Sequence, residues 1–434
     1  MKCINCGTDN KLKDRTANQG RCIKCQHPFV FEPTSMGNVK ITDPFFGKAI
    51  ADISANNTLF FTPKQLLYLL DNRLKPKPSH PISFVFAYLF GNIWCTLFFG
   101  SFSGIIFGDN SFIIVNLLYQ LCVILYLFNN SKSGKVNNAS RQGSANALQK
   151  LGVLILVIGI LVSLFVSKSF PLFASVVILG MASIYLGTRQ LGRIRLVTEE
   201  FFLSQSQFQD WLNRWEKING SILKILPSPR HQIAPVAINS DVTAYSFDRL
   251  VVCDSAAIAQ LLIANNFHFE NNCAILSITG YPESIFDTTM QMLRRNPELK
   301  VYSFHDCSPQ GVGLVHHLGT SPNWFQENNV RIIDLGLLPR QIMAAKRGMF
   351  IQSSRDSAQK AKDLPGEIRQ SLSAEELAWL EAGNFVELES FSPQKLIQIL
   401  HRGIVNGETL DNDDSSLILV GDSANSMYVV ESFG

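Results

Sequence analysis

Charged residues are scarce in this chain, and four long stretches lack them altogether. Asp, Glu, Lys and Arg make up 17% of the 434 residues, and none of them occurs in 82–108, 111–128, 151–167 or 170–187. Each stretch is long enough to cross a hydrocarbon core of roughly 30 Å as a helix, whereas helices buried in a soluble protein normally keep a polar face. The sequence therefore predicts four transmembrane helices between residues 82 and 187. The absence of charge within them argues against a transporter or a proton relay.

The chain also lacks an apolar leader, because its first residues are polar and rich in cysteine, so no signal peptide is expected. The loops around 109–110 and 168–169 are too short to hold a domain, which argues against a receptor for external ligands. Basic residues gather in the other segments that flank the apolar stretches: Arg73, Lys75, Lys77, Lys132, Lys135, Arg141, Lys150, Arg189, Arg193 and Arg195. By the positive-inside rule, this pattern predicts a multi-pass protein of the plasma (inner) membrane with both termini in the cytoplasm.

Cysteine is sparse as well, with nine residues in the chain. Five of them show no paired spacing: Cys95, Cys122, Cys253, Cys273 and Cys307. They are expected to act as small apolar residues, with Cys307, beside Asp306, as the exception to watch. The other four form two Cys-x-x-Cys pairs, Cys3 with Cys6 and Cys22 with Cys25. Two such pairs complete a closed tetrahedral zinc site with no vacancy for a substrate, and the reducing cytoplasm disfavours disulfides.

Residues 1–33, which carry these pairs, resemble the zinc-ribbon family, and the resemblance implies a structural Zn²⁺. Ribbons of this kind bind nucleic acid or protein, or only fold a terminus, and the sequence does not choose among these roles. The rest of the chain divides into five further segments: a cytoplasmic linker with an amphipathic helix (34–81), the four transmembrane helices (82–187), a juxtamembrane helix and linker (188–244), a globular domain (245–405) and a C-terminal extension (406–434).

In the globular domain, apolar runs typical of strands alternate with helical patterns. The strands are expected at 249–255, 273–280, 300–306 and 330–339. This alternation predicts an α/β domain with a Rossmann-like parallel sheet covered on both faces. The whole chain is thus expected to be a multi-domain protein: a zinc ribbon, a four-helix transmembrane region and an α/β domain.

Ligands of such sheets bind beyond the carboxyl ends of the strands, where this chain places Asp254 and Asp306. Either aspartate alone is explained as a helix cap. Two carboxylates at adjacent strand ends repel each other unless a cation such as Mg²⁺ lies between them. Gly280 and Gly311, near helix N-termini, are candidates to bind an anion such as a small-molecule phosphate. His305, His316 and His317 flank this region and are expected to be structural or solvent-facing.

Four segments carry a family resemblance: "ITGYP" (278–282), "FHDCSPQGVGL" (304–314), "DLGLLPRQI" (334–342) and "LAWLEAGNFVELESFSPQKLIQIL" (377–400). They resemble, in order, parts of the Toprim domain of the topoisomerase VI A subunit family over residues 245–405. The resemblance implies a Mg²⁺ site made by a Glu after the first strand and an Asp-x-Asp after the third. The matching residues here are Asp254, Asp306 and Ser308, so the acidic set is degenerate and Mg²⁺ binding should be weakened. The family's DNA-breaking tyrosine domain is replaced by membrane helices, so topoisomerase activity is not expected.

From residue 190 to the end, acidic residues outnumber Lys plus Arg by 28 to 20, whereas a domain that grips a phosphate backbone usually has a basic surplus. The favoured hypothesis is a membrane-anchored, cytoplasm-facing protein whose zinc ribbon and degenerate Toprim-like domain bind or sense a nucleic-acid or protein partner. One alternative is a membrane-tethered, Mg²⁺-dependent nuclease acting on DNA, in defence against foreign DNA. Another gives the same fold a phosphorylated small molecule as ligand. Whether the protein is an enzyme stays open.

Overall fold

The protein is described from a computed structural model. It describes residues 1–37, 39–75, 81–107, 111–133, 136, 138–166, 168–194, 198–229, 248–283, 286–294, 296, 298–326, 330–344 and 349–406. The chain forms two compact units, one made of Met1–Leu74, Phe201–Ala345 and Gln352–Gly434, the other of Lys75–Glu200 and Lys346–Ile351. Most of the predicted linker before the globular domain and of the C-terminal extension lies outside the described residues.

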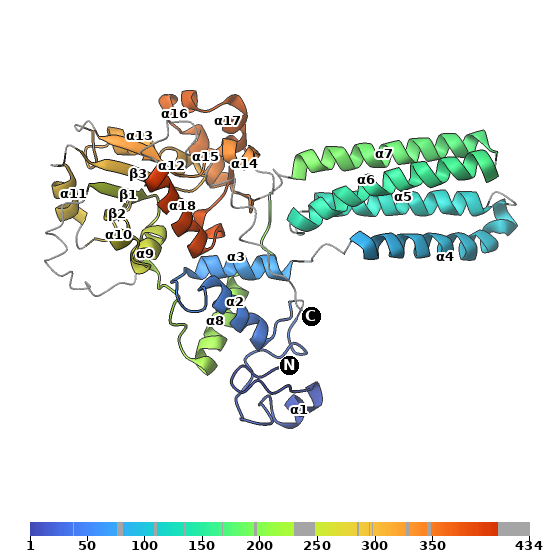
Figure 1. Cartoon of the computed structure of the whole chain (residues 1–434), viewed down its shortest axis with the longest axis horizontal. Helices are drawn as coiled ribbons and strands as arrows, with labels where there is room; N and C mark the ends of the chain where they lie inside the picture. The colour runs from blue at the N-terminus through green and yellow to red at the C-terminus, as the bar shows by residue number, and fades with distance from the viewer. Residues whose placement is uncertain are drawn as a thin grey trace. The chain divides into compact units, whose positions relative to one another are not determined.

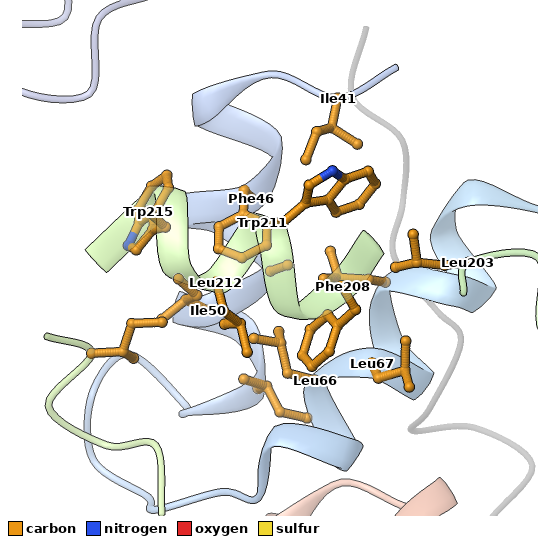
Figure 2. Close-up of a cluster of buried hydrophobic side chains, with 14 of the residues drawn as sticks. Ile41, Phe46, Ile50, Leu66, Leu67, Leu203, Phe208, Trp211, Leu212 and Trp215 are labelled. Carbon is orange, nitrogen blue, oxygen red and sulfur yellow. The ribbon is translucent and has the colours of Figure 1, made fainter. Parts of the chain in front are cut away.

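The segments on either side of the membrane stretches share one hydrophobic core. The helices that build it are α2 (Asp43–Ile53), α3 (Pro63–Leu74) and α8 (Gln205–Asn219). Two caps fix where these helices begin, since the Thr42 hydroxyl accepts the amide of Phe45 and Ser204 forms a capping box with Gln207. Figure 2 shows Phe46, Trp211 and Trp215 meeting in the core, with the Phe46 and Trp215 rings 5.0 Å apart. We call this part the helical module.

The second unit is built from long apolar helices: α4 (Pro81–Phe107), α5 (Ser111–Lys132), α6 (Asn138–Leu161), continued by the π-helical turn η2 (Val162–Val166), and α7 (Phe170–Ile194). Figure 1 shows them lying alongside one another. Three spans, Ser111–Lys132, Ser140–Phe165 and Phe170–Arg193, are long and apolar enough to cross a membrane. In α4 the described apolar part, Phe86–Phe102, is shorter.

Large apolar side chains cover the outside of this helix bundle. Phe90, Phe102 and Phe170 are 75%, 77% and 78% exposed, and many more large apolar side chains of these helices are exposed. A continuous apolar surface of this kind is not sustained in water, so the bundle fits a lipid environment. The prediction of membrane helices is confirmed for three of the four stretches by length and composition.

Glycines set the contact between α6 and α7. A Cβ on Gly152 would lie 2.7 Å from the carbonyl oxygen of Gly180, and a Cβ on Gly180 would lie 2.5 Å from Leu156. Further along the pair, a Cβ on Gly159 would lie 2.3 Å from Val176. The two backbones approach this closely because small residues line the contact, as is common between helices in membranes.

The globular domain contains the predicted parallel sheet. Its strands are β1 (Arg249–Cys253), β2 (Cys273–Ser277), β3 (Lys300–Phe304) and β4 (Arg331–Asp334), in the order β2-β1-β3-β4 and all parallel. Alternate residues of β1 point to opposite faces of the sheet, and Leu250, Val251 and Val252 are all fully buried. Both faces are therefore covered, as the prediction required.

The helices of this domain follow the strands along the chain (Figure 1): α9 (Ala256–Ala264), α10 (Phe267–Glu270), α11 (Phe286–Arg294), α12 (Pro309–Val312), α13 (Leu314–Thr320), α14 (Pro339–Ala344), α15 (Arg355–Lys362), α16 (Gly366–Ser371), α17 (Ala374–Glu381) and α18 (Pro393–Asn406). The strands β5 (Gln352–Ser353) and β6 (Asn384–Phe385) pair as a two-stranded antiparallel sheet, and a 3-10 turn, η5 (Leu388–Ser390), follows. We call this part the sheet domain.

The strand order contains a reversal of direction at β1. From β1 the chain moves to β2 on one side, then crosses back to β3 on the other side of β1. The carboxyl ends of β1 and β3 thus flank the point where the winding reverses. In open parallel sheets, this reversal opens the crevice in which ligands bind.

Candidate functional site

The four ribbon cysteines form a cluster that can hold a metal ion such as zinc. Their sulfur atoms all lie within 4.8 Å of one another, and Cys3 and Cys6 are each 3.6 Å from a sulfur of the other pair. A tetrahedral ion with metal–sulfur bonds of about 2.3 Å requires sulfur–sulfur distances of about 3.8 Å. The geometry therefore fits four thiolates around one ion. Among the described residues, this cluster alone has three or more ligand side chains so close together.

The two Cys-x-x-Cys turns have the same backbone arrangement, which explains their convergence. The amide of Cys3 donates to Thr8 O and that of Cys22 to His27 O, both at 2.9 Å. The residue after each second cysteine, Gly7 or Gln26, has a positive φ of 71° or 60°. Each loop curls back and points both of its sulfurs toward the other loop.

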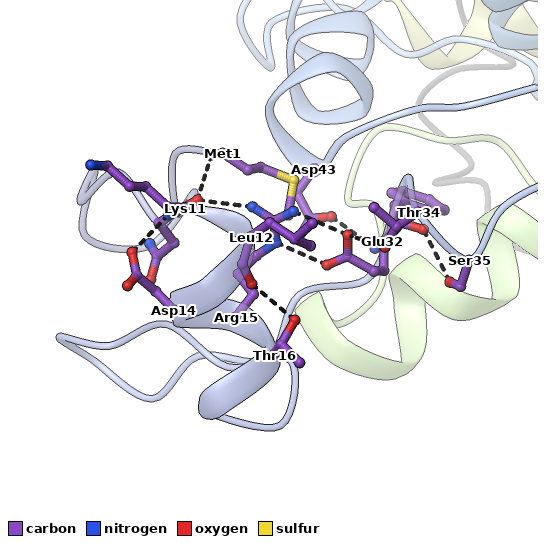
Figure 3. Close-up of polar contacts among 12 residues, drawn as sticks. Met1, Lys11, Leu12, Asp14, Arg15, Thr16, Glu32, Thr34, Ser35 and Asp43 are labelled. Carbon is purple, nitrogen blue, oxygen red and sulfur yellow. Dashed lines mark hydrogen bonds and ion pairs between the residues drawn. The ribbon is translucent and has the colours of Figure 1, made fainter.

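Polar contacts tie the ribbon to the helical module. Arg15 makes a two-pronged contact with Glu32, with Nε 2.8 Å from Oε2 and Nη2 3.0 Å from Oε1 (Figure 3). The buried carboxylate of Asp43, at the start of α2, accepts the amides of Val30 and Phe31 at 3.0 and 2.9 Å. These bonds hold the chain in place where it passes from the ribbon into the module.

The structure brings Asp254 and Asp306 together at the reversal point. Asp254 directly follows β1, and its Oδ2 accepts the backbone amide of Asp306 at 2.7 Å. Its Oδ1 is buried, and among the described residues it has no hydrogen-bond partner. Burial raises the pKa of the Asp254 carboxyl above its usual range. Burial, together with the neighbouring Asp254, raises the pKa of Asp306 strongly.

Two further carboxylates, which the sequence analysis did not single out, belong to the same cluster. A two-bond bridge between Cys307 and Val386 places the segment after β6 beside Asp306, and the amide of Leu388 donates to Asp306 Oδ1. The residues on either side of Leu388 are Glu387 and Glu389. Both contribute to the raised pKa of Asp306, so their charges lie close to it. We call Asp254, Asp306, Glu387 and Glu389 the acidic edge.

The other residues predicted for this site make bonds within the chain. The Ser308 hydroxyl accepts the amide of Gly311 at 3.1 Å and so caps α12. The amide of Gly280 donates to Ser277 O at 3.0 Å. Both glycine amides proposed for anion binding therefore already have an acceptor.

His305 lies beneath the acidic edge as part of a buried ion pair. Its ring is fully buried, with Nε2 2.9 Å from Asp334 Oδ1 and Nδ1 2.8 Å from the carbonyl oxygen of Asp306. Burial opposes protonation, but Asp334 outweighs it and raises the pKa of His305 to about 8. Despite its own burial, Asp334 has a lowered pKa because His305 lies beside it. The expectation that His305 is structural fits this position, and its charge partly offsets the raised pKa of Asp254.

Two glycines make room for that ring. A Cβ on Gly336 would lie 2.2 Å from His305, and a Cβ on Gly311 would lie 2.1 Å from the carbonyl oxygen of Asp306. Neither gap is compatible with a side chain. Gly311 therefore shapes the packing around His305 and Asp306, a role that the sequence alone did not suggest.

The sequence did contain a signal for the missed acids. Glu387 and Glu389 are separated by one residue after a short strand, and both fall within the segment quoted above for its family resemblance. Their place beside Asp306 depends on a bridge between residues far apart in the chain. No protein-family model matches this chain, and no curated protein matches it.

Proposed function

We propose that this protein is a membrane-anchored binding or sensing module whose sheet domain is not catalytic. The observation that carries the proposal is that the chain itself occupies the acidic edge. Asp254 accepts the amide of Asp306, which in turn accepts that of Leu388. Lys64 of α3 lies 2.6 Å from Glu387, and the Thr62 hydroxyl donates to Glu389 at 2.7 Å. Carboxylates that are engaged in this way stabilise the fold rather than present an open cage to Mg²⁺.

The degenerate Toprim-like kinship remains part of this proposal. A parallel sheet with two aspartates at its reversal point supports it, whereas Ser308, at the position of the third acid, departs from the family pattern. A serine hydroxyl carries no charge, and that of Ser308 is engaged as the N-cap of α12. The acidic surplus of this half of the chain also disfavours a DNA backbone as the partner, so a protein or a small phosphorylated molecule fits better.

The path of the chain supports four membrane crossings. Within the first unit, the Asp71 carboxylate accepts the amides of Phe202 and Leu203 at 2.6 and 2.9 Å. Within the second unit, Lys75 lies 2.9 Å from Glu199. The chain therefore leaves for the membrane and returns at the same place, which requires an even number of crossings. Three helices qualify by length and composition, so α4 is the natural fourth, and the basic loops support a cytoplasmic location for both termini.

The ribbon's role in this proposal is structural. Four thiolates around one Zn²⁺ leave no open position for a substrate. Because the chain is bonded to the helical module through Arg15 and Asp43, zinc would order the N-terminal segment against that module.

One observation favours the alternative of a Mg²⁺-dependent nuclease. Asp254 Oδ1 is buried and has no hydrogen-bond partner in the part of the chain that the structure describes. Burial raises the pKa of both Asp254 and Asp306, and a divalent cation beside them would favour their charged forms. Ions at such a site can support hydrolysis of a DNA phosphate. The two proposals therefore differ on whether the acidic edge binds a divalent metal ion.

An activity assay separates them. The full-length protein, purified in neutral detergent, is incubated with supercoiled plasmid and Mg²⁺ or Mn²⁺ beside the variants Asp306→Ala and Asp356→Ala. Asp356 is a matched control because its side chain lies on α15 and is 76% exposed. We expect no nicking above the level of Asp306→Ala. Metal-dependent nicking that Asp306→Ala abolishes and Asp356→Ala keeps would establish the nuclease instead.

A further inference from the structure

The first turns of α3 are bonded to the acidic edge along their length. Four side chains of this segment reach residues 387–391: Thr62 to Glu389 at 2.7 Å, Lys64 to Glu387 at 2.6 Å, Gln65 to the carbonyl oxygen of Phe391 at 2.9 Å, and Tyr68 to Glu387 at 2.6 Å. These partners are more than 300 residues apart in the chain. This is a specific docking of the helical module onto the sheet domain, both of which belong to the first unit.

The Lys64 ammonium group lies between two carboxylates of the acidic edge. Its Nζ is 2.6 Å from Glu387 Oε1 and 3.8 Å from Glu389 Oε2. Burial lowers the pKa of Lys64, but Glu387, Glu389 and Asp306 together raise it more, so the net pKa is raised. One ammonium group therefore forms ion pairs with two of the four carboxylates of the acidic edge, Glu387 and Glu389.

We propose that the Lys64 ammonium group occupies the acidic edge in place of a divalent ion and prevents such ions from binding there. The same contacts hold α3 against the sheet domain. Since a divalent cation needs the same carboxylate oxygens, the two cannot be bound together. The inference rests on the proposed function in one respect, because it explains why the edge is not catalytic. It goes further by naming the residue that prevents metal binding.

The Lys64 contacts also affect how firmly α3 is held. Lys64 lies in the first turn of α3, and the same helix holds the returning chain through Asp71. Loss of the Lys64 contacts should therefore loosen α3 at one end while Asp71 still fixes the other. A divalent ion at the edge would have the same effect as removal of the ammonium group.

The test is a titration of Mn²⁺ alone, by calorimetry, into zinc-loaded full-length protein in neutral detergent. Lys64→Met removes the charge and keeps the length of the side chain, and Lys64→Gln is a second uncharged variant in case the first folds poorly. Lys64→Arg is the matched control because it keeps the charge. Circular dichroism checks the fold of each variant. We expect wild type and Lys64→Arg to bind Mn²⁺ weakly, and the uncharged variants to bind it about tenfold more tightly or better, because a fixed positive charge next to the site is removed.

Two results would overturn the proposal. Equal Mn²⁺ affinity in wild type and the uncharged variants would show that Lys64 does not compete with the ion. No binding in any folded variant would show that Lys64 is not what keeps the ion out. Neither result depends on plasmid nicking, and metal-dependent nicking by wild type would refute the non-catalytic function whatever the titrations show.

Discussion

The buried pair of His305 and Asp334 should give the sheet domain a measurable dependence on pH. The carbonyl oxygen of Asp306 can only accept, so Nδ1 of His305 donates to it, and Nε2 donates to the Asp334 carboxylate. With both nitrogens donating, the ring is an imidazolium at pH values below its pKa. Its pKa of about 8 compares with 6.5 for an unperturbed histidine.

The direction in which stability changes with pH follows from the difference between these two pKa values. A histidine whose folded pKa is raised contributes stability that is complete below pH 6.5 and is lost as the pH rises through 8. A shift of this size corresponds to about 2 kcal/mol, at roughly 1.4 kcal/mol per pH unit. With a urea dependence of about 1–3 kcal/mol per molar, the unfolding midpoint should fall by roughly 1 M between pH 6 and pH 9.

The assay has to isolate the sheet domain, because a chain of several parts does not unfold in one step. Full-length protein is equilibrated in urea at each pH, pulsed with deuterium at a fixed pH, and analysed through peptides from β1 and β3. His305→Gln removes the titration and His317→Gln, at an exposed position, is the control. The raised pKa of Asp306 acts in the same direction, so the quantity that counts is the difference between wild type and His305→Gln. Parallel pH profiles for these two proteins from pH 6 to 9 would refute the reasoning.

Three further predictions concern the ribbon and the membrane helices. Full-length protein should carry one zinc per chain by atomic absorption, and Cys22→Ser should lose it; a folded ribbon without metal would contradict this. Gly152→Ala should destabilise the helix bundle by about 1–3 kcal/mol through overpacking, since its Cβ meets the backbone of α7, whereas Gly192→Ala, with nothing within 4 Å, should be tolerated; equal melting temperatures would be the opposing result. Reporter fusions after Lys135 should signal the cytoplasm and fusions after Ser169 the outside, and the same signal from both would rule out four crossings.

The match between sequence and structure is closest where the signal is local. The parallel sheet was predicted from alternating patterns, and the structure places four parallel strands at those positions, with the fourth shorter than expected at Arg331–Asp334. The convergence of Asp254 and Asp306 followed from their places at strand ends. The carboxyl ends of neighbouring parallel strands lie side by side, so the convergence of the two aspartates could be predicted without knowing the conformation of the loops.

Other features depended on the order of the strands and on bridges between distant segments. The two segments predicted as linkers on either side of the membrane helices pack into one core, because Trp215 from the second lies against Phe46 from the first. Phe31, at the end of the predicted zinc ribbon, joins the same core beside Trp211. No pattern within either linker indicates this pairing. Gly311, predicted as an anion site, instead makes room for the backbone of Asp306.

The sequence alone determined the membrane helices and the cysteine cluster. Crossing a bilayer requires a run of apolar residues, and a metal knuckle requires a fixed spacing, so both are properties of neighbouring residues. The acidic edge and its lysine were decided by the tertiary structure alone. Lys64 and Glu387 are 323 residues apart, and their contact exists only because the helical module docks beside the strand ends and the bridge at Cys307 holds the glutamates there.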